Sequence, residues 1–230
     1  MIRLLISSGP TREPVDAVRF LSNYSTGFMG YCLAMEARRR GHRVTVVSGP
    51  SAFVLPRGVK IVWVESAAQM RRALRPRLSE TDVLIMAAAV CDFQAATPRR
   101  DKLPRRGTLR LQLRATPDIV AGLPRRPGQL IVGFALETKQ ALSRASRKLE
   151  EKRLDLIVGQ TISAKGGSAS GGNGSGSPFG EHPVNAFFLR ASGDVTRLGR
   201  LSKPALARAL LDEIEQLWYG QPGRRALRKG

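Results

Sequence analysis

The sequence has little that would support a disulfide framework, a membrane span or an aromatic nucleic-acid surface. Only two of its residues are cysteine, Cys32 and Cys91, which is typical of chains that fold in a reducing cytoplasm. Apolar runs stay well short of the ~20 residues that a transmembrane helix needs. Met1 is followed almost at once by a strand pattern rather than by a signal peptide. We therefore expect a cytoplasmic globular protein without a membrane anchor.

Acidic residues are also scarce relative to basic ones. Lys and Arg number 38 against 18 Asp and Glu, which gives a formal net charge of +20. Such an excess favours anionic partners, namely nucleotides, phosphorylated metabolites or nucleic acid. A nucleic-acid-binding protein would stripe its basic residues with exposed aromatics, but aromatics make up only 6% of the chain and form no stripe. Nucleic acid is thus an unlikely partner, and most of the arginines are expected to be solvated surface.

The dinucleotide-binding fingerprint G-x-G-x-x-G is missing as well. Pro10 follows Gly9, and residues 27–30 supply only G-x-x-G. This absence counts against an NAD(P)-dependent oxidoreductase on a Rossmann-like fold, which is the second alternative to the function developed below.

Short apolar runs alternate with helical patterns along the chain. Strands are expected at 2–6, 43–48, 59–64, 82–88, 129–135 and 154–158, and helices at 31–40, 67–78, 142–153 and 203–218, with a further helix starting at Thr116. The β-α-β order predicts an α/β fold, a Rossmann-like doubly wound, mostly parallel sheet with helices on both faces. Residues 94–113 read as a loop and a short strand outside that sheet, a small β subregion, and a terminal hairpin turns at 192–194. We expect one domain over 1–220, with a flexible Gly/Ser-rich loop at 165–177 and a disordered basic tail at 221–230.

The stretch Ser7–Gly30, after the first expected strand, is rich in groups that bind anions. Gly9 lets the backbone approach a ligand closely, and Arg19 can pair with phosphate or carboxylate. Ser25 and Thr26 can cap the next helix, whose N-terminus favours negative charge. Strand-to-helix loops usually run about 2–6 residues, so a loop this long indicates a binding site. The alternative is an ordinary turn with a glycine and a cap.

Several segments resemble, in order, the signature of the phosphopantothenate–cysteine ligase family. They are G-P-T-R-E-P (9–14), V-R-F-L-S-N (18–23), S-T-G (25–27) and M-G (29–30), then A-A-A-V-C-D-F (87–93), P-D-I-V (117–120) and G-F-A-L-E-T (133–138). The match runs on to Asp155 and continues more weakly at 179–180 and Asn185. A flavin-dependent decarboxylase domain often precedes this region in the family, and we expect a stand-alone ligase here.

The resemblance implies which residues form the site. Asn23 would hold and polarise an acyl-nucleotide, and Lys102, on a mobile lid, would close over the phosphates as the second catalytic residue. Substrate would contact Arg19, Asn23, Ala88 and Ala89. Nucleotide would contact Gly9, Thr11, Ser25, Gly27, Asp92, Pro117, Asp118, Ile119, Val120, Phe134, Lys148 and Lys152. Asp92 can bind a ribose hydroxyl, a base amine or a metal, although a lone aspartate there is as often a cap, and the metal ligands stay unassigned.

The chain departs from the family pattern at several positions. Pro104 and Arg105 stand in the lid where the family has K-x-K-K. Phe28 replaces the lysine of S-G-K-M-G, and Gln160 replaces an asparagine after a strand. These changes alter the lid's contacts, remove a charge near a helix start and shift one polar group.

The reaction that the resemblance implies joins 4′-phosphopantothenate to L-cysteine in coenzyme A biosynthesis. The pantothenate carboxylate attacks the α-phosphate of CTP, or less favourably ATP, pyrophosphate leaves, and the cysteine amine then attacks the acyl-nucleotide. Because two anions meet in the first step, dense positive charge and Mg²⁺ make physical sense. The family forms homodimers whose sites borrow groups from the partner, and residues 94–113 and the terminal hairpin are the expected contact elements.

Overall fold

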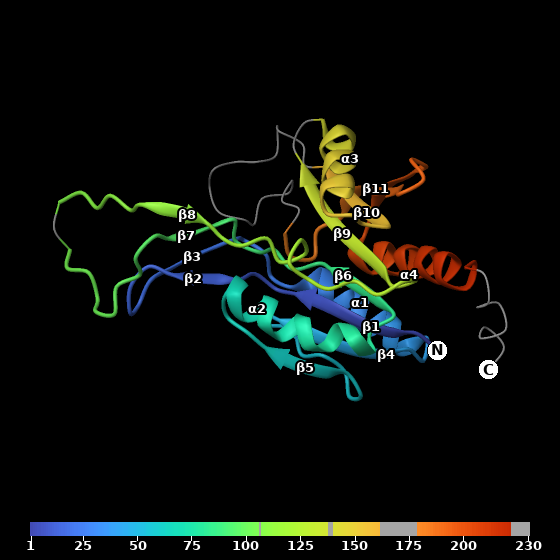
Figure 1. Cartoon of the computed structure of the whole chain (residues 1–230), viewed down its shortest axis with the longest axis horizontal. Coiled ribbons are helices and arrows are strands. Elements are labelled where there is room, and N and C mark those ends of the chain that lie inside the picture. The colour runs from blue at the N-terminus through green and yellow to red at the C-terminus, as the bar shows by residue number, and fades with distance from the viewer. Residues whose placement is uncertain (106, 138–139, 162–178, 222–230) are drawn as a thin grey trace.

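The computed structural model describes residues 1–105, 107–137, 140–161 and 179–221. An eight-stranded sheet forms its centre, in the order β12-β11-β10-β9-β6-β1-β4-β5 (Figure 1). The parallel strands are β1 (Arg3–Ser8), β4 (Arg43–Ser48), β5 (Lys60–Trp63), β6 (Val83–Met86), β9 (Leu130–Glu137) and β10 (Leu156–Thr161). The fold predicted from the sequence, a doubly wound and mostly parallel sheet, is confirmed. The expected Gly/Ser-rich loop at 165–177, and all but the first residue of the expected tail at 221–230, lie outside the described residues.

Helices cover both faces of this sheet and define two apolar cores. α1 (Phe28–Arg39) and α4 (Lys203–Tyr219) lie on one face, and α2 (Ala67–Leu74), the 3₁₀ helix η1 (Arg75–Glu80) and α3 (Ala141–Glu151) on the other. Successive residues of a strand point to opposite faces. Leu4 and Ile6 of β1 therefore pack towards α1 and α4, and Leu5 packs towards α2 and α3. No helix in the described part of the chain is both long and apolar enough to cross a membrane.

The antiparallel strands at the edge of the sheet form the expected terminal hairpin. β11 (Val184–Arg190) pairs with β10 and with β12 (Val195–Leu201). The turn between them contains Gly193 at φ 91°, a left-handed conformation that glycine adopts without a Cβ clash. The hairpin is longer than the sequence pattern indicated, because its exposed strand β12 carries polar residues that do not read as a buried run.

Two short antiparallel pairs form an arm outside the main sheet. The sequence indicated only a short strand within 94–113, and the pair β2–β3 lies in the stretch that was expected to be a loop. β2 (Arg12–Pro14) pairs with β3 (Phe20–Ser22), and β7 (Phe93–Ala95) pairs with β8 (Leu113–Ala115). The arm projects from the body of the molecule (Figure 1). Of the alternating leucines at 109–113, only Leu113 lies in a strand.

Two helix predictions were wrong in extent or kind. The segment that begins at Thr116 forms turns, not a helix, because Gly122 and Pro124 leave too few residues for a stable helix. The Thr116 hydroxyl donates to the Cys91 carbonyl at 2.7 Å instead of capping. The helix expected at 67–78 ends at Leu74 and continues as η1, whose start contains a proline.

Candidate functional site

The order in which the chain adds strands to the sheet reverses between the neighbouring strands β1 and β6. From β1 the sheet continues through β4 and β5, and from β6 it continues through β9 and β10. In such sheets ligands bind beyond the carboxyl ends of the strands at the reversal. The loops that follow β1 and β6 stay paired, with Thr11 N donating to Ala89 O at 3.2 Å and Ala89 N donating to Gly9 O at 2.9 Å. Two motifs that lie some eighty residues apart in the sequence thus form one wall.

A cleft of about 800 Å³ lies at this edge of the sheet. Its walls come from the start of α1, the loop after β6, residues 115–120, the ends of β9 and β10, α3, and the start of α4. The residues predicted from the sequence that line it are Asn23, Ser25, Gly27, Ala88, Ala89, Asp92, Pro117, Asp118, Ile119, Val120, Phe134, Lys148 and Lys152. Gly9, Thr11, Arg19 and Lys102 do not line it.

The start of α1 forms one end of the cleft, but its cap differs from the expected one. Gly27 is the N-cap residue, at φ 83°, and the Thr26 Oγ1 accepts a hydrogen bond at 3.4 Å from the N–H of Phe28, the first residue of the helix. A Cβ on Gly27 would lie 2.7 Å from the Ser51 Oγ, so space as well as conformation requires glycine here. Neither Ser25 nor Thr26 is the N-cap residue, but Thr26 accepts from the first N–H of α1 and the Ser25 Oγ accepts from Gly27 N at 3.4 Å, so the predicted cap is met in part. Because no carboxylate lies in the first turn of α1, its N-terminus can accept an anionic ligand.

Gly9 and Thr11 lie behind the cleft, where they fix the loops. Gly9 has φ 75°, and a Cβ there would lie 2.9 Å from the Gly49 carbonyl oxygen. The sequence analysis expected Gly9 to let the backbone approach a ligand. In the structure Gly9 instead lies close to the backbone of Gly49. Thr11 is fully buried, and its Oγ1 accepts a hydrogen bond from Cys91 N at 2.9 Å. In this conformation Thr11 shapes the wall and does not present its hydroxyl to the cleft.

Asn23 connects the two loops that form the wall. Its Nδ2 donates to Ala89 O at 3.1 Å and to Val90 O at 3.0 Å. The side chain is exposed to the cleft and makes contacts far along the chain rather than a local turn. Both amide hydrogens are occupied, so donation to a substrate carbonyl requires that one of these bonds be exchanged.

Lys148 of α3 and Lys152, the C-cap residue of this helix, form the opposite wall. Lys148 Nζ donates to Phe134 O at 2.7 Å, and Lys152 Nζ pairs with Asp118 Oδ2 at 3.0 Å. Burial lowers the pKa of Lys148, and the neighbouring Lys152 charge lowers it further. The carboxylates of Asp92 and Asp118 raise this pKa, but the overall shift is downward. Burial raises the pKa of Asp118, but the hydrogen bond and charge of Lys152, together with hydrogen bonds from backbone N–H groups, lower the pKa overall. A half-buried ammonium beside a second one favours an incoming anion.

The two predicted site residues on the arm stand apart from this cleft. Arg19 Nη1 pairs with Asp16 Oδ2 at 2.5 Å and donates to Leu103 O at 3.3 Å. Asp16 Oδ2 also accepts from Leu103 N at 3.0 Å. Hydrogen bonds to Asp16, first that from Val18 N, lower its pKa to about 2. Arg19 therefore anchors the segment that carries the exposed Lys102, and neither residue lines the cleft that contains Asn23.

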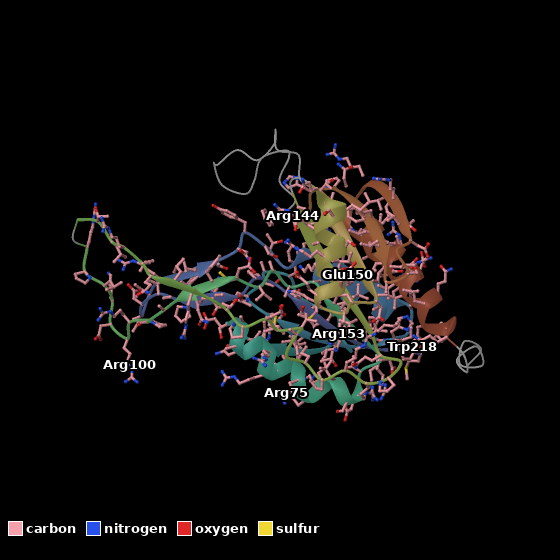
Figure 2. The ribbon with its side chains drawn as sticks, turned by 45° about the horizontal axis from the view of Figure 1, so that its top comes forward. Arg75, Arg100, Arg144, Glu150, Arg153 and Trp218 are labelled. Carbon is pink, nitrogen blue, oxygen red and sulfur yellow. The ribbon has the colours of Figure 1, made fainter. Side chains whose placement is uncertain are left out.

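Many of the arginines lie on the surface and are exposed to solvent. Figure 2 shows Arg100 at the outer end of the arm, directed away from the body. Arg75, Arg144 and Arg153 are exposed as well, so many of the positive charges are solvated.

Within the described ranges no group of three or more His, Cys, Asp and Glu could hold a metal ion. The exposed carboxylate of Asp92 in the cleft wall suits a Mg²⁺ that arrives with substrate phosphates, since Mg²⁺ needs only one or two protein carboxylates in such sites.

Sequence reasoning missed Lys203, which lines the cleft at the start of α4. Lys203 is 5% exposed, and its Nζ donates to Gly180 O at 2.6 Å. One signal was present in the sequence, because a cation in the first turn of a helix opposes the helix dipole. Tyr24 and Phe179 were also missed, and their rings lie 6.0 Å apart at the cleft.

Comparisons with known proteins agree with this fold. The family model of the "DNA/pantothenate metabolism flavoprotein C-terminal domain" matches residues 1–217. The chain is 38% identical over 217 residues to the coenzyme A biosynthesis bifunctional protein CoaBC of Bacillus subtilis, which covers 93% of this chain and 51% of the relative. It is 44% identical over 160 residues to a cysteine/cysteine sulfinic acid decarboxylase of an unknown prokaryotic organism, covering 68% of this chain and 45% of the relative. The chain thus spans about half the length of the curated relatives it matches.

Among solved structures, the crystal structure of the C-terminal domain of a coenzyme A biosynthesis bifunctional protein CoaBC is similar, with a TM-score of 0.78 and 33% identity. That similarity covers 96% of this chain and 97% of the other. The family resemblance carried by the sequence motifs is confirmed. The chain belongs to the family of the DNA/pantothenate metabolism flavoprotein C-terminal domain.

Proposed function

We propose that the protein is a phosphopantothenate–cysteine ligase that acts in coenzyme A biosynthesis. The observation that carries the proposal is the cleft at the reversal point of the sheet. It has the N-terminus of α1 at one end and the ammonium groups of Lys148 and Lys152 at the other. The helix N-terminus carries a partial positive charge and the lysines a full one, and they belong to a scaffold whose family match extends over 1–217. The relatives named CoaBC support the pathway.

In the first step the carboxylate of 4′-phosphopantothenate attacks the α-phosphate of a nucleoside triphosphate. A carboxyl–phosphate bond forms, and pyrophosphate leaves. The free N–H groups at the start of α1 would bind phosphate oxygens, and Lys148 and Lys152 would offset the charge that accumulates when two anions meet. Mg²⁺ held at Asp92 together with the phosphates would supply further charge neutralisation when bound.

In the second step the amine of cysteine attacks the acyl carbon and releases the nucleoside monophosphate. Asn23 lies in the wall of the cleft, next to the small residues Ala88 and Ala89. Small side chains there leave room for the acyl group. Exchange of one Asn23 hydrogen bond from a wall carbonyl to the acyl oxygen would place a donor where negative charge develops.

We propose that the working unit is a homodimer, because Arg19 and Lys102 lie on the arm. The arm also exposes large apolar side chains, with Phe20 at 47%, Phe93 at 54% and Leu113 at 43%. Apolar groups on a projecting arm gain from burial against a second copy. A dimer would let these two cations reach the cleft of the partner. Sedimentation that shows only monomer at working concentration would contradict this assembly.

The nucleotide is CTP rather than ATP in this proposal, on the basis of Asp92 and the P-D-I element at 117–119. The decisive experiment follows pyrophosphate release with phosphopantothenate, cysteine and Mg²⁺, with CTP and ATP in parallel. We expect faster release with CTP, and accumulation of acyl-nucleotide when cysteine is left out. Absence of release with both nucleotides would remove the ligase assignment.

A further inference from the structure

The start of α4 lies at the same edge of the sheet as the cleft. β12 ends at Leu201, opposite Val184 of β11, and Ala186 of β11 lies opposite Gln160 of β10. Lys203 follows β12 by two residues. The pairing therefore brings Lys203 and Gln160 to the same carboxyl edge, with β11 between their strands, and both line the cleft.

The two side chains also lie on the same face of the sheet. Leu156 and Val158 belong to the core that packs against α1 and α4. Because strand residues alternate between faces, Gln160 points to that face too. α1 and α4 pack against each other on this face, so the N-termini of both helices converge on this end of the cleft.

Gln160 is a buried amide whose hydrogen-bonding groups are unused. It is 8% exposed, and within the part of the chain that the structure describes its side chain has no hydrogen-bond partner. Buried amides normally find partners, because leaving them unpaired costs free energy. A ligand that enters the cleft would supply an acceptor for the amide N–H groups.

Lys203 is placed where an anion would relieve two unfavourable interactions. Its ammonium is buried, which lowers the pKa to about 8. It also stands in the first turn of the 17-residue helix α4, where the positive end of the helix dipole opposes a cation. Its Nζ donates to Gly180 O at 2.6 Å, and an ammonium can make several hydrogen bonds at once.

We propose that Lys203 and Gln160 form a phosphoryl-binding subsite at the α1 and α4 end of the cleft. This inference rests on the proposed function for the identity of its ligand. The phosphoryl group comes either from the triphosphate of the nucleotide or from the 4′-phosphate of phosphopantothenate. Both present the same chemistry, a small dianionic group with several acceptor oxygens.

The test uses Lys203→Met and Gln160→Leu in the full chain, with Arg208→Met as the control. Arg208 lies on the same helix, is exposed and does not line the cleft. Calorimetry measures the binding of inorganic pyrophosphate, CTP, CMP, phosphopantothenate and pantothenate. Lys203→Met should weaken the ligand that occupies the subsite by about 10- to 100-fold, as expected for a charge-assisted hydrogen bond, and Gln160→Leu by a smaller factor.

The pattern of losses identifies the source of the phosphoryl group. Weaker CTP and pyrophosphate with unchanged CMP indicates the triphosphate, and weaker phosphopantothenate with unchanged pantothenate indicates the 4′-phosphate. Gln160→Leu should also raise the melting temperature, because it removes a buried amide that has no partner among the described residues. This variant still tests the subsite if Lys203→Met does not fold. Binding of every ligand within twofold of wild type in folded variants overturns the subsite.

The binding measurement does not depend on turnover. A protein that binds pyrophosphate through Lys203 but releases none from CTP would retain the subsite and lose the ligase assignment. A protein that turns over normally, with both variants at wild-type affinity, would lose the subsite and keep the ligase.

Discussion

Replacing Lys148 with Met should separate nucleotide binding from stability. Met keeps the length of the side chain and removes its charge. The bond from Lys148 Nζ to Phe134 O, 2.7 Å long, joins a charged group to a carbonyl, and such bonds contribute about 1.5–3 kcal/mol. Burying the ammonium costs an amount of the same order, and burial indeed lowers the pKa of Lys148. The two effects nearly cancel, so the free energy of unfolding should change by less than about 1 kcal/mol.

Binding should respond much more strongly than stability. With the nucleotide bound, the Lys148 ammonium gains an anionic partner, while Lys152 remains paired with Asp118 at 3.0 Å. Losing one charge-assisted hydrogen bond of about 1.5–3 kcal/mol raises the Kd for the nucleotide by about 10- to 150-fold. Titration calorimetry with CTP measures the affinity, and urea denaturation measures the stability of the same preparation.

Arg147→Met is the matched control for this experiment. Arg147 precedes Lys148 on α3, but its side chain is 73% exposed and only contacts Glu151 at 3.7 Å. Its replacement should leave the Kd within twofold of wild type and the stability within about 0.5 kcal/mol. A Lys148→Met protein that loses more than about 2 kcal/mol of stability and binds CTP like the wild type would refute the reasoning. It would show that Lys148 anchors the end of β9 and does not bind nucleotide.

Three further predictions concern other parts of the molecule. Asn23→Asp places a carboxylate against two wall carbonyls and should slow the second step by roughly a hundred- to thousandfold; single-turnover analysis that shows normal conversion of the acyl-nucleotide would contradict the role of Asn23. Lys102→Gln should slow pyrophosphate release and leave the melting temperature unchanged, because the side chain is exposed; an unchanged rate would show that neighbouring arginines suffice. The hydrogen bond from Arg39, together with that from Arg40, lowers the pKa of Glu36 from 4.5 to about 2. The ionised Glu36 therefore stabilises the folded state fully above pH ~4.5, and this stabilisation, on the order of 2 kcal/mol, is lost as the pH falls towards 2. Glu36→Gln should flatten the fall in unfolding free energy measured between pH 5 and pH 2.5, and an unaltered slope would refute the assignment.

Local pattern by itself determined the main sheet and its helices. β4 was predicted with its observed bounds, since Arg43–Ser48 is β-branched and ends at a glycine and a proline. Runs such as Val83–Met86 are apolar on both faces, and only a central parallel strand buries both. The expected cleft residues came from the family resemblance, and those that follow β1 and β6 line one cleft because these strands are parallel neighbours in the sheet.

The roles of individual residues were decided by tertiary contacts that no local pattern encodes. Gly9 is required by the Gly49 backbone, and the Thr11 hydroxyl is occupied by Cys91 N. Arg19 is only four residues from Asn23, yet it pairs with Asp16 on the arm. Lys203 and Gln160 line the same cleft because a hairpin returns the chain to the carboxyl edge of the sheet, where α4 starts. Periodicity records which face a residue occupies along its own element, whereas the partner of a side chain depends on which distant elements the packing of the sheet brings beside it.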